Sequence, residues 1–155
     1  MSTSGEAVVL DASVAVKWFK KGERLEDEAL ALKDRVFGSG VKALTSEWLL
    51  LEVVRAMVKA GLPVGKVAEA YLILREMGRL GFMEAVPVGE VLDLAKDAMM
   101  ELPLYASDSV YLATSIKRGA SLVTDDRHLL RADVVEYGRS RGVEVLGLRE
   151  LPQFG

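Results

Sequence analysis

The sequence of 155 residues contains no cysteine and a single histidine, His128. Without cysteine the chain has no disulfide, no thiolate nucleophile and no cysteine-bound zinc. With one histidine, a multi-histidine metal centre within one chain is excluded as well. Any metal that the chain holds must therefore be bound by oxygen, and oxygen ligands suit hard ions such as Mg²⁺ and Mn²⁺.

The sequence also lacks an apolar run of the roughly 18 residues that a membrane helix needs. Its first six residues, MSTSGE, lack the basic stretch and apolar core of a secretory signal, so we expect a soluble, cytoplasmic protein. Half of the residues (50%) are hydrophobic, which allows a sizeable core. No linker or repeat divides the chain, and we expect one domain over residues 1–155 with a core from about 7 to 147.

The formal net charge of −3 does not give the basic footprint that is usual in nucleic-acid-binding proteins. Setting aside the four carboxylates discussed below changes this sum to +1. The basic residues gather in three places, at Lys17, Lys20, Lys21 and Arg24, at Lys117 and Arg118, and at Arg127 and Arg131. A solvated helix face is the simpler interpretation of any one cluster, and contact with a nucleic acid is the alternative.

Short apolar runs alternate with segments of helical period along the chain. We expect strands at 8–10, 41–44, 121–123 and 143–146, and an edge strand at 82–88 because it holds a proline. We expect helices at 14–20, 25–37, 47–59, 64–79, 91–100, 107–118, 127–132 and 134–140. This alternation predicts an α/β fold in which helices cover both faces of a mostly parallel central sheet.

Four carboxylates stand out by their positions. Asp11 and Asp126 each follow a predicted strand, where open α/β sheets bind their ligands. Glu52 is surrounded by apolar neighbours in one helix, and Asp108 lies in the first turn of another helix that is mostly apolar. The structural alternatives are helix caps for Asp11 and Asp126, an ion pair with Arg55 for Glu52, and the helix dipole for Asp108.

Taken together, the four acids predict a metal site, which none of them predicts alone. Carboxylates that converge raise one another's pKa unless a cation lies between them. Mg²⁺ takes few protein oxygens and keeps room for water and for a phosphodiester. The set therefore predicts a site for Mg²⁺ or Mn²⁺, to which Asp125 is a further candidate contributor. His128 has no serine–acid partners that the sequence indicates, so we expect it to face solvent rather than to act as a general base.

Three blocks of the sequence resemble the PIN-domain ribonucleases, and among them the VapC toxins of prokaryotic VapBC toxin–antitoxin pairs. The blocks are Val8–Ser13, Glu52 in a helix entered through Thr45 and Ser46, and residues 105–126. The resemblance implies a metal-binding, catalytic set of Asp11, Glu52, Asp108 and Asp126, with Ser13 and Thr124 in support. It further implies Mg²⁺- or Mn²⁺-dependent hydrolysis of single-stranded or loop RNA, a homodimer or higher oligomer, and silencing by a VapB-like antitoxin.

Residues 53–107 contain no signature that matches the family, which leaves substrate and partner less constrained than the fold. Two alternatives stay within the family: a module that binds RNA or antitoxin without turnover, and a PIN nuclease of RNA processing that has no antitoxin. A phosphatase of the haloacid-dehalogenase type needs a second aspartate where this chain has Ser13. A receiver-type module is disfavoured because the first strand ends in a single acid.

Overall fold

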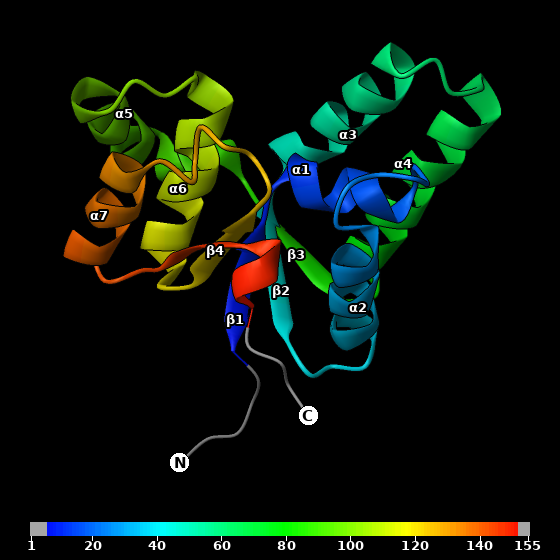
Figure 1. Cartoon of the computed structure of the whole chain (residues 1–155), viewed down its shortest axis with the longest axis horizontal. Helices are drawn as coiled ribbons and strands as arrows, with labels where there is room; N and C mark the ends of the chain where they lie inside the picture. The colour runs from blue at the N-terminus through cyan, green and yellow to red at the C-terminus, as the bar shows by residue number, and fades with distance from the viewer. Residues whose placement is uncertain (1–5, 152–155) are drawn as a thin grey trace.

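The computed structural model describes residues 6–151, which form an α/β domain around one five-stranded, fully parallel sheet in the order β3-β2-β1-β4-β5 (Figure 1). The strands are β1 (Ala7–Leu10), β2 (Lys42–Ser46), β3 (Met83–Val86), β4 (Ser121–Thr124) and β5 (Val145–Gly147). The α-helices are α1 (Ala12–Ala15), α2 (Glu26–Phe37), α3 (Trp48–Lys59), α4 (Val64–Arg79), α5 (Leu92–Glu101), α6 (Ala106–Arg118) and α7 (Ala132–Ser140). Short 3-10 helices are η1 (Val16–Trp18), η2 (Val88–Val91) and η3 (Leu148–Glu150). The predicted fold class is confirmed.

The strand order reverses beside β1, and this reversal positions the candidate site. From β1 the chain continues to β2 and β3 on one side, and it later returns to add β4 and β5 on the other side. The carboxyl ends of β1 and β4 therefore lie next to each other, with Leu10 paired to Val123. In open α/β sheets this switch point leaves a crevice in which ligands bind.

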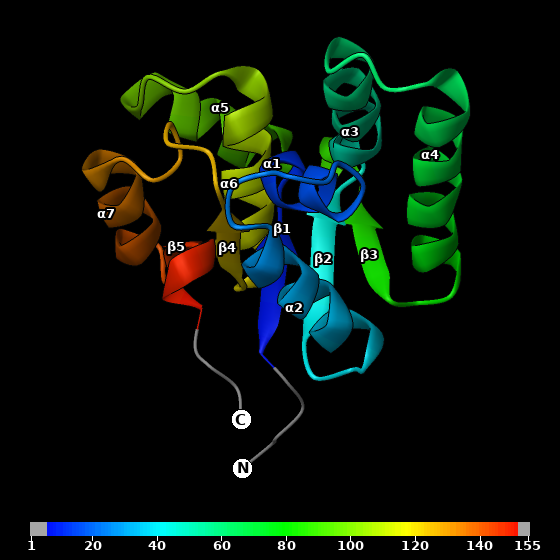
Figure 2. The same ribbon diagram turned by 45° about the vertical axis from the view of Figure 1, so that its right-hand side comes forward.

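Helices cover both faces of the sheet (Figure 2). Helix α6 contacts β1, β2 and β4 on one face, and α2 lies on the other face. The side chains of Val8, Val9 and Leu10 in β1 are accordingly all buried, whichever face they point to. A strand that is covered on both faces consists of consecutive apolar residues, which is why three such residues were sufficient to predict β1.

Helix α6 is the most deeply buried helix, with every residue from Asp108 to Ser115 inside the protein. Its hydroxyl groups are satisfied locally: Thr114 donates to the carbonyl of Val110 at 2.7 Å, and Ser115 donates to the carbonyl of Ala120. These bonds offset the cost of burying polar groups. The helix ends at Gly119, whose φ of +63° is a left-handed conformation that glycine adopts without strain.

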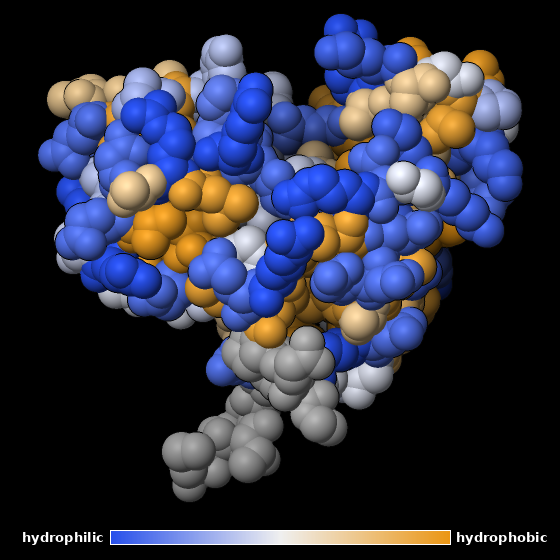
Figure 3. Space-filling model, viewed as in Figure 1, coloured by the Kyte–Doolittle hydropathy of each residue, from blue (hydrophilic) through white to orange (hydrophobic). Residues whose placement is uncertain are grey.

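Helices α3 and α4 form an antiparallel pair that projects beyond the sheet on the β3 side (Figures 1 and 2). Their buried stripes include Leu49, Val53 and Met57 from α3 and Leu74 and Met77 from α4. Other apolar side chains of the pair stay exposed, and Figure 3 shows hydrophobic surface over this part of the molecule.

Several predicted boundaries are wrong. The helix predicted at 14–20 is α1 followed by η1, and the helix predicted at 127–132 is a series of turns. Ser107 does not cap α6, because Tyr105 occupies that position with extended backbone and the helix begins two residues earlier than Ser107 would require. Asp11 does stand at the start of α1, but its carboxylate makes no capping bond.

Other predictions are confirmed closely. The edge strand with its following proline is β3, which lies at the edge of the sheet. Ser46 assists the entry of α3, since its hydroxyl accepts a hydrogen bond from the backbone N–H of Trp48 at 3.1 Å. Within residues 6–151 no helix is both long and apolar enough to cross a membrane. The expected start at Met1–Gly5 and the end of the domain at 152–155 lie outside the described residues.

Candidate active site

Asp11 is fixed at the end of β1 by two hydroxyl groups. Ser13 Oγ donates to Oδ1 of Asp11 at 2.6 Å, and Thr124 Oγ1 donates to Oδ2 at 2.5 Å. Asp11 is 3% exposed, and a buried carboxylate needs such partners. Two separate parts of the chain thus position Asp11. Ser13 lies just after β1, and Thr124 is the last residue of β4.

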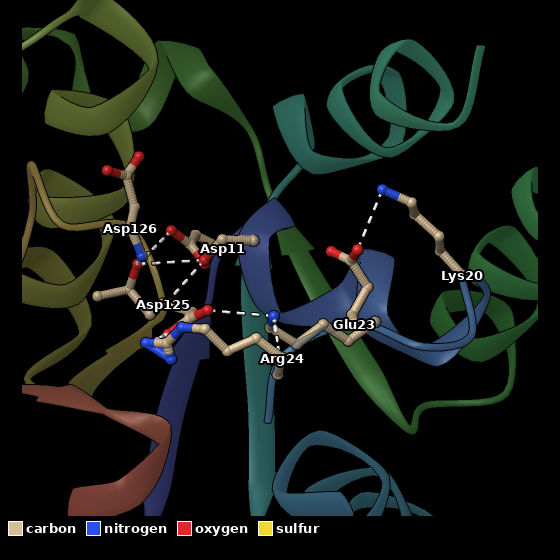
Figure 4. A network of polar contacts seen from close by, with 9 residues as sticks. Asp11, Lys20, Glu23, Arg24, Asp125 and Asp126 are labelled. Carbon is tan, nitrogen blue, oxygen red and sulfur yellow. Dashed lines mark hydrogen bonds and ion pairs between the residues drawn. The ribbon is translucent and has the colours of Figure 1, made fainter. Parts of the chain in front are cut away.

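The segment after β4 turns around the same hydroxyl groups (Figure 4). The backbone N–H of Asp125 donates to Ser13 Oγ at 2.8 Å, and that of Asp126 donates to Thr124 Oγ1 at 2.9 Å. Asp126 Oδ1 in turn accepts a hydrogen bond from the backbone N–H of His128 at 2.8 Å. Asp11 and Asp126 therefore sit on one rigid hydrogen-bonded frame at the crevice between β1 and β4.

Two helices bring the remaining acids. Asp108 lies in the first turn of α6, is 7% exposed and shares a hydrogen bond with Asp126. Glu52 comes from α3 and is half-buried. The hydroxyl of Tyr111 in α6 donates to Glu52 Oε1 at 2.5 Å, and Ser107 makes a second hydrogen bond to the same carboxylate. Glu52 thus turns toward α6, rather than to the ion pair with Arg55 that was its structural alternative.

The four acids influence one another's protonation. Burial raises the pKa of Asp11 to about 7 against the lowering effect of Ser13 and Thr124, and the charge of Asp126 raises it further. Burial also raises the pKa of Asp108 to about 7, with added repulsion from Asp126, Asp11 and Glu52. The pKa of Glu52 is raised by burial and, less strongly, by Asp126. The chain thus brings all four predicted acids within electrostatic range of one another.

Asp125 adjoins Asp126, but its carboxylate contacts cations of the chain instead of other acids. Its Oδ2 lies 3.1 Å from Lys17 Nζ, and its Oδ1 lies 3.0 Å from a guanidinium nitrogen of Arg24 (Figure 4). Lys17 is 4% exposed and also donates to the carbonyl of Arg24 at 2.6 Å. Asp125 is thus neutralised by two cations of its own chain, and its role here is to fix the loop that carries Asp126.

The donor set fits a hard divalent cation. A set of carboxylates whose main charged neighbours are other carboxylates gains most from an added cation. Among residues 6–151, no three Asp, Glu, His or Cys side chains are arranged as a ready-made group for a metal ion. Mg²⁺ does not require such a cage, because it commonly takes one or two carboxylates and completes its shell with water and substrate phosphate. Asp108 and Asp126, which share a hydrogen bond, and Asp11, whose charge acts on both, are the acids that would hold it, with Glu52 in electrostatic range.

Sequence reasoning missed two of the groups that shape the site. Tyr111 had a usable signal, because its helical spacing from Asp108 places both on one face of α6. No sequence signal indicated the pairing of Lys17 with Asp125. The two residues are far apart in sequence, and Lys17 belongs to a cluster that resembles a solvated helix face. Its burial depends on the loop after η1 passing beside β4.

Comparison with known proteins identifies the family and the fold. The family model of the PIN domain matches residues 8–135. A solved structure, the crystal structure of PAE2754 from Pyrobaculum aerophilum, is similar with a TM-score of 0.55 and 18% identity, covering 96% of this chain and 93% of that chain. At that identity the likeness shows the fold alone. The search of curated proteins gives no match. PIN domains are generally nucleases that use divalent metal ions. Because the matched span includes most of the chain, the protein belongs to the PIN-domain family.

Proposed function

We propose that this protein is a Mg²⁺- or Mn²⁺-dependent endoribonuclease, and that it is the VapC-like toxin of a toxin–antitoxin pair. The observation that carries the catalytic part is the contrast between two neighbouring acids. Asp125 is neutralised by Lys17 and Arg24, whereas Asp126 faces Asp11 and Asp108 at the switch point of the sheet. The chain provides cations for one aspartate and leaves the others to an external cation.

The residues of the site have distinct tasks in this proposal. Asp11, Asp108, Asp126 and Glu52 would hold the cation, whose positive charge would offset their repulsion of the phosphodiester. Ser13 and Thr124 hold both oxygens of Asp11 in one orientation, so that little reorganisation is needed when substrate arrives. When bound, the divalent cation supplies activation of water and neutralisation of charge at the phosphate. We assign no side-chain general base.

The catalytic proposal is tested by cleavage of a mixed structured RNA with added Mg²⁺ or Mn²⁺. We expect cleavage by the wild type, and loss of cleavage in Asp11→Asn and in wild type with chelator. Asp93→Asn is the matched control, because Asp93 is an exposed aspartate of α5 away from the site, and it should cleave as wild type does. Cleavage that persists in chelator would reject metal dependence, and cleavage by Asp11→Asn would reject the role of Asp11.

The partner proposal rests on the resemblance together with the surface of the α3–α4 pair. Exposed apolar side chains there include Leu51 at 61%, Val58 at 55% and Leu72 at 65% exposure. Such exposure is typical of surfaces that bind another chain. We propose that a second copy of the chain and a VapB-like antitoxin use this surface.

Two measurements test the partner proposal. Light scattering at high concentration should give a homodimer or higher oligomer, and a monomer would contradict it. Expression in a prokaryotic host should arrest growth, Asp11→Asn should not, and co-expression of a small DNA-binding protein encoded beside the gene should restore growth. Growth arrest without such relief would favour a PIN nuclease of RNA processing, and RNA binding without cleavage would favour a module without turnover.

A further inference from the structure

Two aromatic rings meet at the solvent side of the acidic cluster. Tyr105 is 70% exposed, and its ring stands edge-to-face with that of His128 at a centroid distance of 5.7 Å and an interplanar angle of 85°. His128 is exposed as well. An exposed tyrosine ring of this extent offers a flat apolar face on which another planar group can stack.

The two rings come from the segments that carry the metal-binding acids. Tyr105 directly precedes α6 and lies three residues before Asp108, which is one helical turn. His128 lies two residues after Asp126, and its backbone N–H donates to Asp126 Oδ1 at 2.8 Å. Because Asp108 and Asp126 also contact each other, the ring pair and the acid pair bridge the same two segments. The rings therefore lie beside the point where a phosphodiester would meet the acids.

We propose that Tyr105 and His128 form a nucleobase-binding subsite, in which the base of an unpaired nucleotide stacks on the exposed ring of Tyr105 while its phosphate meets the acidic cluster. This inference rests on the proposed function and deepens it, because it assigns the residues that would contact the base beside the cleaved bond. A base within a duplex has both faces covered by its neighbours, so only an unpaired base offers a face to the ring.

The chemistry around the rings favours a nucleic acid over a protein partner. Arg127 lies between Asp126 and His128 in the sequence and is exposed, so the loop that carries His128 also carries a cation of the kind that contacts backbone phosphates. Both rings have polar tips, the phenol hydroxyl and the imidazole nitrogens, which suit the polar edge of a base. Stacking of a base on an aromatic side chain tolerates different sequences, because every base has a π-face.

The subsite is tested with labelled single-stranded RNA and the full chain. Binding is measured by fluorescence anisotropy in Ca²⁺, a hard cation with oxygen ligands, and cleavage is measured in Mn²⁺. We expect Tyr105→Ala to weaken binding and raise KM about tenfold, Tyr105→Phe to retain wild-type values, and His128→Ala to give a smaller loss. Phe37→Ala is the matched control, expected to behave as wild type, because Phe37 is an exposed ring in an edge-to-face pair with Phe82 and lies before β2, at the opposite end of the strands from the site. Melting curves establish that the variants are folded.

An abasic substitution distinguishes stacking from other effects. With the wild type, we expect KM to be about tenfold higher for an RNA that lacks one base beside the cleaved bond than for the intact RNA. With Tyr105→Ala, we expect the two RNAs to have the same KM. Equal loss in both proteins would overturn the subsite, as would wild-type binding by Tyr105→Ala, which would assign the rings to a protein partner. Binding that falls in Tyr105→Ala without cleavage by any protein retains the subsite and rejects turnover. Absence of RNA binding by the wild type rejects both.

Discussion

Lys17 and Arg24 both contact the carboxylate of Asp125, and their variants should differ sharply in stability. The distances are nearly equal, 3.1 Å from Lys17 Nζ and 3.0 Å from Arg24, but Lys17 is 4% exposed and the Arg24 side chain is 62% exposed. Removal of one partner from a buried ion pair commonly costs about 3–5 kcal/mol, whereas an exposed pair contributes about 0–1 kcal/mol. Burial, not distance, should therefore decide the difference.

For Lys17→Met we expect a loss of about 2–3 kcal/mol in the free energy of unfolding. The loss lies below the usual range because Asp125 keeps its contact with Arg24, although the carbonyl of Arg24 loses the Lys17 donor. For Arg24→Met we expect less than about 1 kcal/mol. In a domain of this size the first value corresponds to a decrease of roughly 5–10 °C in Tm.

Urea denaturation of the two variants measures this difference directly. The double variant Lys17→Met/Asp125→Asn should recover part of the loss, because it no longer buries an aspartate that lacks its lysine. Equal costs for Lys17→Met and Arg24→Met would refute the argument from burial. A double variant that is no more stable than Lys17→Met would show that the loss comes from packing of the lysine stem instead.

Three further predictions concern the acids. Mn²⁺ should raise the Tm of the wild type and raise that of Asp11→Asn less; an equal increase in both would count against Asp11 as a ligand. In chelator, Tm should fall as pH rises from about 4 through 7, because the folded state holds Asp11 and Asp108 with pKa values near 7 and so binds more protons than the unfolded chain over this range. Added Mn²⁺ should flatten that slope, and a Tm that rises with pH in chelator would contradict the raised pKa values. Tyr111→Phe should leave Glu52 without its 2.5 Å donor, lowering cleavage about tenfold at saturating RNA while Tm changes by only a few degrees; loss of folding without change in kcat would assign Tyr111 to the core alone.

The elements that sequence predicted well are those decided by local burial. Residues 8–10 and 121–123 are short, mostly apolar runs, and they form the neighbouring strands β1 and β4. Their apolar side chains are buried because helices cover the sheet. Helices α2, α3 and α4 begin and end within about one residue of the predicted bounds, since their apolar period and their flanking residues agree. The local sequence pattern was sufficient to predict an element wherever that pattern and the tertiary contacts favour the same structure.

The misses lie beside the site, where side chains compete with the backbone for hydrogen bonds. The segment 127–132 has helical composition, yet the Asp126 carboxylate takes the N–H of His128 and the Asp126 carbonyl takes those of Leu129 and Leu130. Arg131 then adopts extended backbone before α7, so no helix continues through this segment. An aspartate that binds its own following backbone favours turns over helix, and this tendency was not used in the prediction.

The loop that follows β4 shows why consecutive acids have separate roles. Successive residues of an extended segment point to opposite sides, and here Asp125 points to Lys17 and Arg24 while Asp126 points to Asp108. The first contact fixes the loop to η1 and to the segment that follows it, and the second places a negative charge in the crevice. If the loop is held by Lys17, then Lys17→Met should displace Asp126 and lower the affinity for Mn²⁺ although Lys17 touches no metal-binding acid. Arg24→Met, which leaves the buried anchor in place, should change that affinity little, and isothermal titration of the two variants with Mn²⁺ compares them directly. Wild-type affinity in both variants would mean that Ser13 and Thr124 position Asp126 without help from the ion pair.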